Sequence, residues 1–116
     1  MVVPQTRRAR AARRRSRRVA ASGSDLTAAQ WQLILDAWGC CAYCGDEAAA
    51  LQKDCVLPIS RGGRYTLENV VPACRSCNAS KCNDEVTSWM RSRRLDEPKF
   101  LLRWVSVLRE LRTTTA

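Results

Sequence analysis

Two short cysteine pairs constrain the fold of this chain more than any other feature of its sequence. Each pair has the C-x-x-C spacing, and residues 45–73 lie between them. Two such pairs supply the four thiolates of a closed tetrahedral zinc site. Cys40 adjoins the first pair, but only its neighbour has the required spacing. We therefore predict a structural Zn²⁺ ion bound by Cys41, Cys44, Cys74 and Cys77.

The other cysteines indicate the compartment in which the protein works. The chain has seven cysteines and no histidine, and an odd number without a recognisable secretory signal argues against a disulfide framework. No apolar run is long enough to cross a membrane. We therefore expect a protein of a reducing, cytoplasmic compartment with no membrane association, and Cys82 as a small buried side chain. An organellar transit peptide at the start of the chain is the alternative.

The positive charge of the chain is concentrated at its N-terminus. The net charge is +9, and residues 1–24 hold eight arginines and no acidic residue. We therefore predict a disordered arm over residues 1–24 and one nearly neutral folded domain over residues 25–116. The arm is either a solvated tail or a segment that binds the phosphates of nucleic acid. In the second case its candidate contacts include Arg7, Arg8, Arg13, Arg14 and Arg15.

The pattern of capping, apolar and turn residues predicts two strands and a helix between flanking helices. Residues 27–30 form a capping box, and Gly39 ends the helix that follows. Residues 51–59 and 69–72 predict strands around a glycine-containing turn, and a helix runs from residue 77 to about residue 81. Together with the cysteine pairs, these elements predict a small α+β fold built around a metal ion.

Two further helices are expected after Cys82. Asn83 or Asp84 can cap the first helix, and residues 96–98 place a proline at the start of the second. An apolar stripe then runs along the second helix. We expect this stripe to cover the core, and the alternative is a surface that binds a second copy or another protein. The stripe consists of Leu101, Trp104, Val105, Leu108 and Leu111.

Four motifs follow one another between residues 38 and 81. They are Cys41-Ala-Tyr-Cys44-Gly45, Asp54-x-Val56-x-Pro58-x-Ser60-x-Gly62-Gly63, Thr66-x-x-Asn69-Val70-Val71-Pro72 and Cys74-Arg75-Ser76-Cys77-Asn78-x-x-Lys81. In order, spacing and residue type this segment resembles the zinc-stapled branch of the HNH endonucleases. The resemblance implies a ββα-metal fold of the His-Me finger type. It also implies DNA as the partner, hydrolysis of phosphodiester bonds with one Mg²⁺ or Mn²⁺ ion, and an origin in a bacterium, a phage or another mobile element.

The resemblance also implies roles for single residues. Asp54 and Asn78 match the positions that bind the catalytic cation, which prefers hard oxygen ligands. Asn69 matches the asparagine that braces the loop through backbone hydrogen bonds. The basic residues in or beside the motifs are expected to contact phosphates. These are Arg61, Arg64, Arg75 and Lys81.

Cys55 is the departure from the family's catalytic motif. The resemblance places a histidine here, as the general base that activates the attacking water, and no other histidine can substitute. General-base assistance is worth about 10²–10⁴-fold in rate, and a neutral thiol supplies it poorly. Three interpretations stay open. Cys55 is an inert substitution in a relative that only binds DNA, or an unusual base or metal ligand, or a buried bystander while the cation or a phosphate oxygen activates the water.

These patterns lead to one main functional prediction and two alternatives. We expect an HNH-type, metal-dependent DNA endonuclease that is slow or nicks its substrate. The first alternative is a non-catalytic zinc module that binds nucleic acid, and the second is a small basic protein whose last helix recruits a partner. The retained residues Asp54, Asn69, Asn78 and Lys81 favour the main prediction over the second alternative, whereas Cys55 favours the first alternative.

Overall fold

The computed structural model of the chain describes residues 7, 10–11, 25–47 and 50–115. Most of the predicted arm lies outside these residues, so its disorder and the domain boundary at residue 25 stay predictions. Among the predicted arm contacts, Arg7 is described and exposed. The others, Arg8, Arg13, Arg14 and Arg15, lie outside the described residues.

Helix α2 (Ala28–Trp38) begins and ends where the sequence predicts. The Thr27 hydroxyl accepts a hydrogen bond from the backbone N–H of Gln30, and the Gln30 side chain accepts one from the N–H of Thr27. Gly39 ends the helix in the left-handed conformation, with φ at 68°, which glycine adopts without a steric penalty. The helix buries Ile34 and Trp38 and leads the chain to the first cysteine pair.

Strands β1 (Gln52–Cys55) and β2 (Val70–Ala73) pair antiparallel, with Asp54 opposite Val71. Successive side chains of a strand point to opposite faces. Gln52 and Asp54 therefore share one face of β1, and Cys55 lies on the other.

The predicted strand over residues 51–59 is wrong beyond residue 55. The backbone of Leu57 is hydrogen-bonded to the side chain of Asn69 and not to a neighbouring strand. The short 3₁₀ turn η1 (Ile59–Arg61) then follows Pro58. A side chain from twelve residues further along thus ends the strand early, which the local β propensity does not indicate.

Helix α3 (Arg75–Lys81) follows β2 and completes a ββα unit. The sulfur of Cys74 caps it by accepting a hydrogen bond from the N–H of Cys77 at 3.4 Å, so the helix starts two residues earlier than predicted. Helix α4 (Val86–Ser92) is capped by the carboxylate of Glu85, which accepts from two backbone N–H groups. The predicted caps Asn83 and Asp84 are wrong, because those residues form the turn between the helices.

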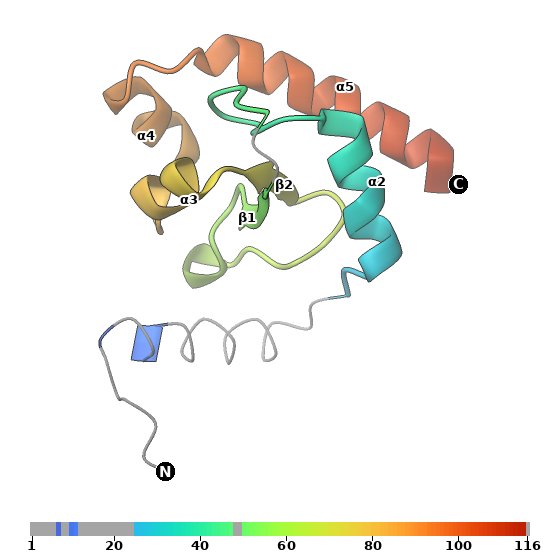
Figure 1. Ribbon diagram of the computed structural model, residues 1–116, viewed down its shortest axis with the longest axis horizontal. Helices are drawn as coiled ribbons and strands as arrows, with labels where there is room; N and C mark the ends of the chain where they lie inside the picture. Colours follow the sequence, from blue (N-terminus) through green and yellow to red (C-terminus); the bar gives the residue numbers. More distant parts are fainter. Residues whose placement is uncertain (1–6, 8–9, 12–24, 48–49, 116) are drawn as a thin grey trace.

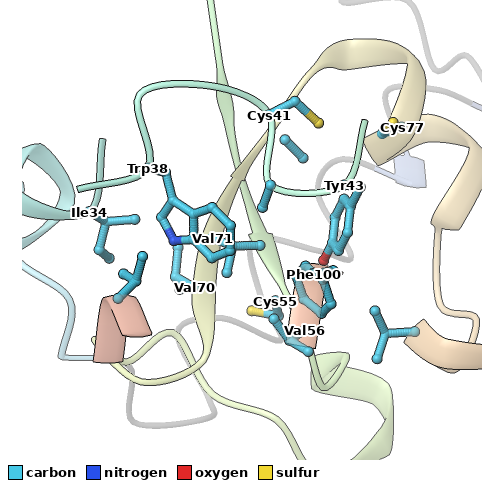
Figure 2. Packing of buried hydrophobic residues seen from close by; sticks show 14 of the residues in the cluster. Ile34, Trp38, Cys41, Tyr43, Cys55, Val56, Val70, Val71, Cys77 and Phe100 are labelled. Carbon is cyan, nitrogen blue, oxygen red and sulfur yellow. The ribbon is translucent and has the colours of Figure 1, made fainter. Parts of the chain in front are cut away.

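Helix α5 (Glu97–Thr115) starts at the predicted proline motif, and Asp96 accepts a hydrogen bond from the N–H of Lys99. Its buried residues are Phe100, Val107 and Leu111. The predicted stripe is right for Leu111 and wrong for Val105, which is 48% exposed. The ring of Phe100 packs against Trp38 and Tyr43, at centroid distances of 6.1 and 5.1 Å (Figure 2).

Figure 1 shows how these elements surround the sheet. Helices α3 and α4 lie on one side of the two strands, and α2 packs on β2 and on α5. None of the helices in the described ranges is both long and apolar enough to span a membrane. The fold is a small α+β domain in which flanking helices enclose a ββα unit, as predicted.

Candidate functional site

Four thiols meet where the two cysteine pairs come together. All four sulfur atoms lie within 4.8 Å of one another, and those of Cys44 and Cys74 are 3.8 Å apart. A tetrahedral site with zinc–sulfur bonds of about 2.3 Å has sulfur–sulfur edges of about 3.8 Å. The spacing therefore fits one tetrahedral metal ion and is compatible with the predicted zinc site. The predicted grouping is confirmed for Cys41, Cys44, Cys74 and Cys77.

Cys40 and Cys82 lie outside this cluster. The thiol of Cys40 is 3.5 Å from the carbonyl oxygen of Trp38, so the choice of Cys41 over Cys40 is correct. Cys82 is exposed at the end of α3, and its predicted burial is wrong. Its φ of 49° lies in a region that residues other than glycine rarely adopt, at the point where the chain turns from α3 toward α4.

Asp54 is buried between the thiol cluster and α3. Its Oδ2 atom accepts a hydrogen bond from the hydroxyl of Tyr43, the residue that precedes Cys44 in the first cysteine pair. The same oxygen forms an ion pair with Lys81, whose Nζ lies 3.2 Å away. Both contacts therefore go to Oδ2, and Oδ1 has no hydrogen-bond partner among the described residues.

The surroundings of Asp54 act in opposite directions on its charge. Burial raises the pKa of the Asp54 carboxyl, while the Lys81 ammonium and the Tyr43 hydroxyl oppose this rise. Burial and the negative charge of Asp54 raise the pKa of Tyr43 well above its usual range. Tyr43 therefore stays protonated, and its hydroxyl donates a hydrogen bond to the carboxylate. The result is a carboxylate that two donors anchor at one oxygen.

Asn78 lies beside Asp54, on the face of α3 that meets β1. Its Nδ2 atom donates a hydrogen bond of 2.8 Å to Oε1 of Gln52, which leaves its Oδ1 without a partner in the described part of the chain. Asp54 and Asn78 line the same cavity of about 510 Å³. The structure thus brings two predicted cation ligands to one cavity, each with one hard oxygen atom to offer. Such a donor set suits Mg²⁺ or Mn²⁺.

Cys55 is buried in the wall of this cavity and is 7% exposed. Its sulfur lies 4.0 Å from the carbonyl oxygen of Arg64. Burial and the negative charge of Asp54 raise the pKa of the Cys55 thiol to about 12. The group is therefore a neutral thiol at physiological pH. In that form it neither takes a proton from water nor binds a metal ion as a thiolate.

Asn69 holds the loop that connects the strands. Its side chain accepts a hydrogen bond from the N–H of Leu57 and donates to the carbonyl oxygens of Leu57 and Arg64, at 2.8, 3.0 and 2.9 Å. Gly63 lies against the same backbone, since a Cβ atom there would be 1.7 Å from the carbonyl oxygen of Leu57. The loop that carries Arg61 and Arg64 therefore has its shape fixed by contacts within the protein.

The basic residues predicted to contact phosphates divide into two groups. Arg61, Arg64 and Arg75 are exposed, and Arg75 lines the cavity. Lys81 is 0% exposed, and besides its ion pair it donates a hydrogen bond of 2.9 Å to the carbonyl oxygen of Cys55. Its ammonium group therefore holds the residues of the site and does not reach the surface. Ala11 also lines the cavity, so one described residue of the arm lies at the site.

The sequence patterns did not identify Tyr43 and Gln52 as residues of the site. Tyr43 lies between two predicted metal ligands, where any residue satisfies the C-x-x-C spacing. Gln52 precedes Asp54 by two positions, and the period of a strand places both side chains on one face. That alternation was the available signal for Gln52, whereas the contact of Tyr43 depends on tertiary packing.

In a comparison with protein families, residues 41–91 match the HNH endonucleases. Comparisons with curated proteins and with solved structures give no match. The matched segment includes all four cysteines of the thiol cluster as well as Asp54 and Asn78. It runs from the first cysteine pair to α4, and it covers less than half of the 116 residues. The resemblance that the motifs indicated is thus confirmed, because residues 41–91 match the HNH endonuclease family.

Proposed function

We propose that this protein is a metal-dependent DNA endonuclease of low activity, which hydrolyses phosphodiester bonds at the cavity between β1 and α3. One observation carries the proposal: Asp54 and Asn78 line the same cavity, and each has a side-chain oxygen atom without a hydrogen-bond partner among the described residues. A bound Mg²⁺ or Mn²⁺ ion would stabilise the negative charge that develops on the phosphate and on the leaving oxygen.

The thiol cluster has a separate, structural role in this proposal. Four thiolates at tetrahedral spacing and with no open position suit Zn²⁺ as a structural ion. The cluster joins the loop after α2 to the start of α3, and α3 forms one wall of the cavity. None of the seven cysteines forms a disulfide bond, which supports a reducing compartment such as the cytoplasm.

The substrate contacts follow from the exposed basic residues. Arg75 lines the cavity, and Arg61 is held beside it by a hydrogen bond from its Nε to the carbonyl oxygen of Asn83. We assign both, together with Arg64, to phosphate contacts, because guanidinium groups bind phosphate oxygens in a bidentate manner. Ala11 at the cavity supports a contribution from the arginine-rich arm. Lys81 is left out of this group because it is buried on Asp54.

The state of Cys55 determines the rate of DNA cleavage that we expect. Its neutral, buried thiol does not act as the general base, so the attacking water has no side-chain base at this position. The loss of such a base costs about 10²–10⁴-fold in rate. We therefore expect slow cleavage or nicking. The same observation supports a second candidate function, a zinc module that binds nucleic acid without cleaving it.

Cleavage of supercoiled plasmid with Mg²⁺ or Mn²⁺ distinguishes the two candidates. We expect slow nicking by the wild-type protein and loss of nicking in Asp54→Ala. Because Asp54→Ala leaves Lys81 unpaired, Asn78→Ala serves as a second loss-of-function variant on a half-buried side chain. We expect Cys55→His to raise the rate by about 10²–10⁴-fold, and Cys55→Ser, which adds no base, to leave it unchanged. A folded Cys55→His protein that binds DNA and cleaves it with neither cation would favour the binding module.

A further inference from the structure

We propose that Tyr43 and Gln52 are positioning residues of the cavity, which turn one oxygen atom of Asp54 and one of Asn78 toward a bound divalent cation. Neither residue belongs to the motif positions to which the family resemblance gives a role. The inference rests on the proposed function, because it concerns the same cation site.

Tyr43 acts on Asp54. Its ring is buried and is held by Trp89 and Phe100, both at a centroid distance of 5.1 Å. Figure 2 shows the Tyr43 hydroxyl pointing away from Cys41. Because that hydroxyl donates to Oδ2, the carboxylate cannot rotate without breaking the bond. Oδ1 is therefore held in one direction, and the packing of the Tyr43 ring beside the thiol cluster determines that direction.

Gln52 acts on Asn78 in the same way. An asparagine amide has one end that donates and one end that accepts. The bond from Nδ2 of Asn78 to Oε1 of Gln52 fixes which end lies where, and it leaves the oxygen for the cation. Without this bond, the amide can turn its NH₂ group toward the site, where it repels a cation.

The contact between Gln52 and Asn78 lies beside the ion pair of Asp54 and Lys81, where β1 packs against α3. Gln52 and Asp54 are two residues apart on β1, and their partners Asn78 and Lys81 are three residues apart on α3. These spacings put each pair on one face of its element. Residues that orient metal ligands in this way typically change metal affinity by about 10–100-fold when they are replaced.

The test measures Mn²⁺ affinity in the full-length, zinc-loaded protein, using the electron paramagnetic resonance signal of free Mn²⁺. Asn78→Ala defines binding at this site. We expect Tyr43→Phe and Gln52→Met each to weaken Mn²⁺ binding by at least about tenfold. The matched control is Gln32→Met, which removes the same functional group from a hydrogen bond to Asp36 on α2. Its Mn²⁺ affinity should equal that of the wild-type protein.

Two further variants separate positioning from a general loss of structure. Gln52→Glu keeps an acceptor for Nδ2 of Asn78 and should bind Mn²⁺ at least as tightly as the wild-type protein. Val107→Ala, at a buried residue of α5, should lower the melting temperature without changing Mn²⁺ affinity. The absorption spectrum of Co²⁺ in the four-cysteine site should be the same in Tyr43→Phe as in the wild-type protein.

The outcomes distinguish this inference from the function on which it rests. If the wild-type protein binds Mn²⁺ no better than Asn78→Ala, the proposed cation site is absent and both fail. If the wild-type protein binds better and Gln52→Met matches it, the positioning inference is overturned and the proposed nuclease function stands. Gln52 is exposed and its replacement spares the core, so this variant decides the matter even if Tyr43→Phe is poorly folded.

Discussion

Replacing Lys81 by methionine should destabilise the protein strongly, and a second substitution should reverse most of that effect. The Lys81 ammonium is fully buried, lies 3.2 Å from Oδ2 of Asp54 and donates to the carbonyl oxygen of Cys55. At an effective dielectric constant of about 20, two unit charges at this distance attract each other by about 5 kcal/mol. Removing one partner of a buried pair typically costs about 3–5 kcal/mol, because the other charge is left buried and uncompensated. We expect Lys81→Met to lower the free energy of unfolding by an amount in this range.

The double variant Asp54→Asn/Lys81→Met tests that explanation. It removes both charges but keeps an oxygen atom that can accept the hydrogen bond of Tyr43, so it should be more stable than Lys81→Met alone. Urea unfolding of the zinc-loaded proteins, followed by circular dichroism, gives the free energies. Lys99→Met, on the surface of α5, is the matched control and should unfold like the wild-type protein. The single variant Asp54→Asn completes the comparison. If the losses in free energy of unfolding of Asp54→Asn and Lys81→Met add up in the double variant, the buried pair is not the source of the loss.

The same variant should show a characteristic dependence on pH. Burial raises the pKa of Asp54, and Lys81 opposes this rise, so Lys81→Met should raise the pKa further. An acid with a raised pKa binds its proton more tightly in the folded state, and the stability that it contributes is lost as pH rises through the folded pKa. The cost of Lys81→Met should therefore shrink as the pH is lowered from neutrality into the acidic range. A cost that grows over this range would contradict the assignment.

Three further predictions concern the metal, the arm and Cys55. Chelation of zinc should unfold the domain, because metal binding contributes folding free energy at such sites, and cooperative unfolding of the metal-free protein would argue against a structural role for the four cysteines. Deletion of residues 1–24 should weaken DNA binding and flatten its dependence on salt, and an unchanged salt slope would exclude the arm from phosphate contacts. With a pKa of about 12 and a buried side chain, Cys55 should resist iodoacetamide at pH 8 while the exposed Cys82 reacts. Peptide mass spectrometry measures the labelling of each cysteine, and fast labelling of Cys55 would contradict its neutral, buried state.

The features that the sequence predicts well are those that depend on neighbouring residues. The capping box at Thr27, the glycine stop at Gly39 and the C-x-x-C pairs each act within a few positions, so spacing alone indicates their geometry. The family motif adds the order of the longer elements. For this reason both the ββα unit and the grouping of the four cysteines could be predicted from the sequence.

The features that the sequence misses depend on which surfaces meet. Lysine is rarely fully buried, so nothing near Lys81 in the sequence indicates that it pairs with Asp54 inside the protein. The early end of β1 depends on the side chain of Asn69, and the position of Cys82 depends on a turn that an unusual φ makes possible. Each of these results requires the relative placement of elements that are distant in the chain.

The contact between α5 and α2 has a consequence for where this unit can be cut. Arg103 on α5 donates a hydrogen bond of 3.0 Å to the carbonyl oxygen of Ala37, near the C-terminal end of α2, and its guanidinium lies 5.9 Å from the centre of the Trp38 ring. The segment that carries the family motif, residues 41–91, contains neither helix.

The segment that matches the family, residues 41–91, is therefore shorter than the part of the chain that packs into one domain, which includes α2 and α5. A fragment cut at the limits of the motif would expose Tyr43, because the ring of Phe100 that packs against it would be lost. During translation, the hydrogen bond between Arg103 and the carbonyl oxygen of Ala37 can form only after α5 has left the ribosome. Anyone who transplants this cavity into another protein would need to carry both helices with it.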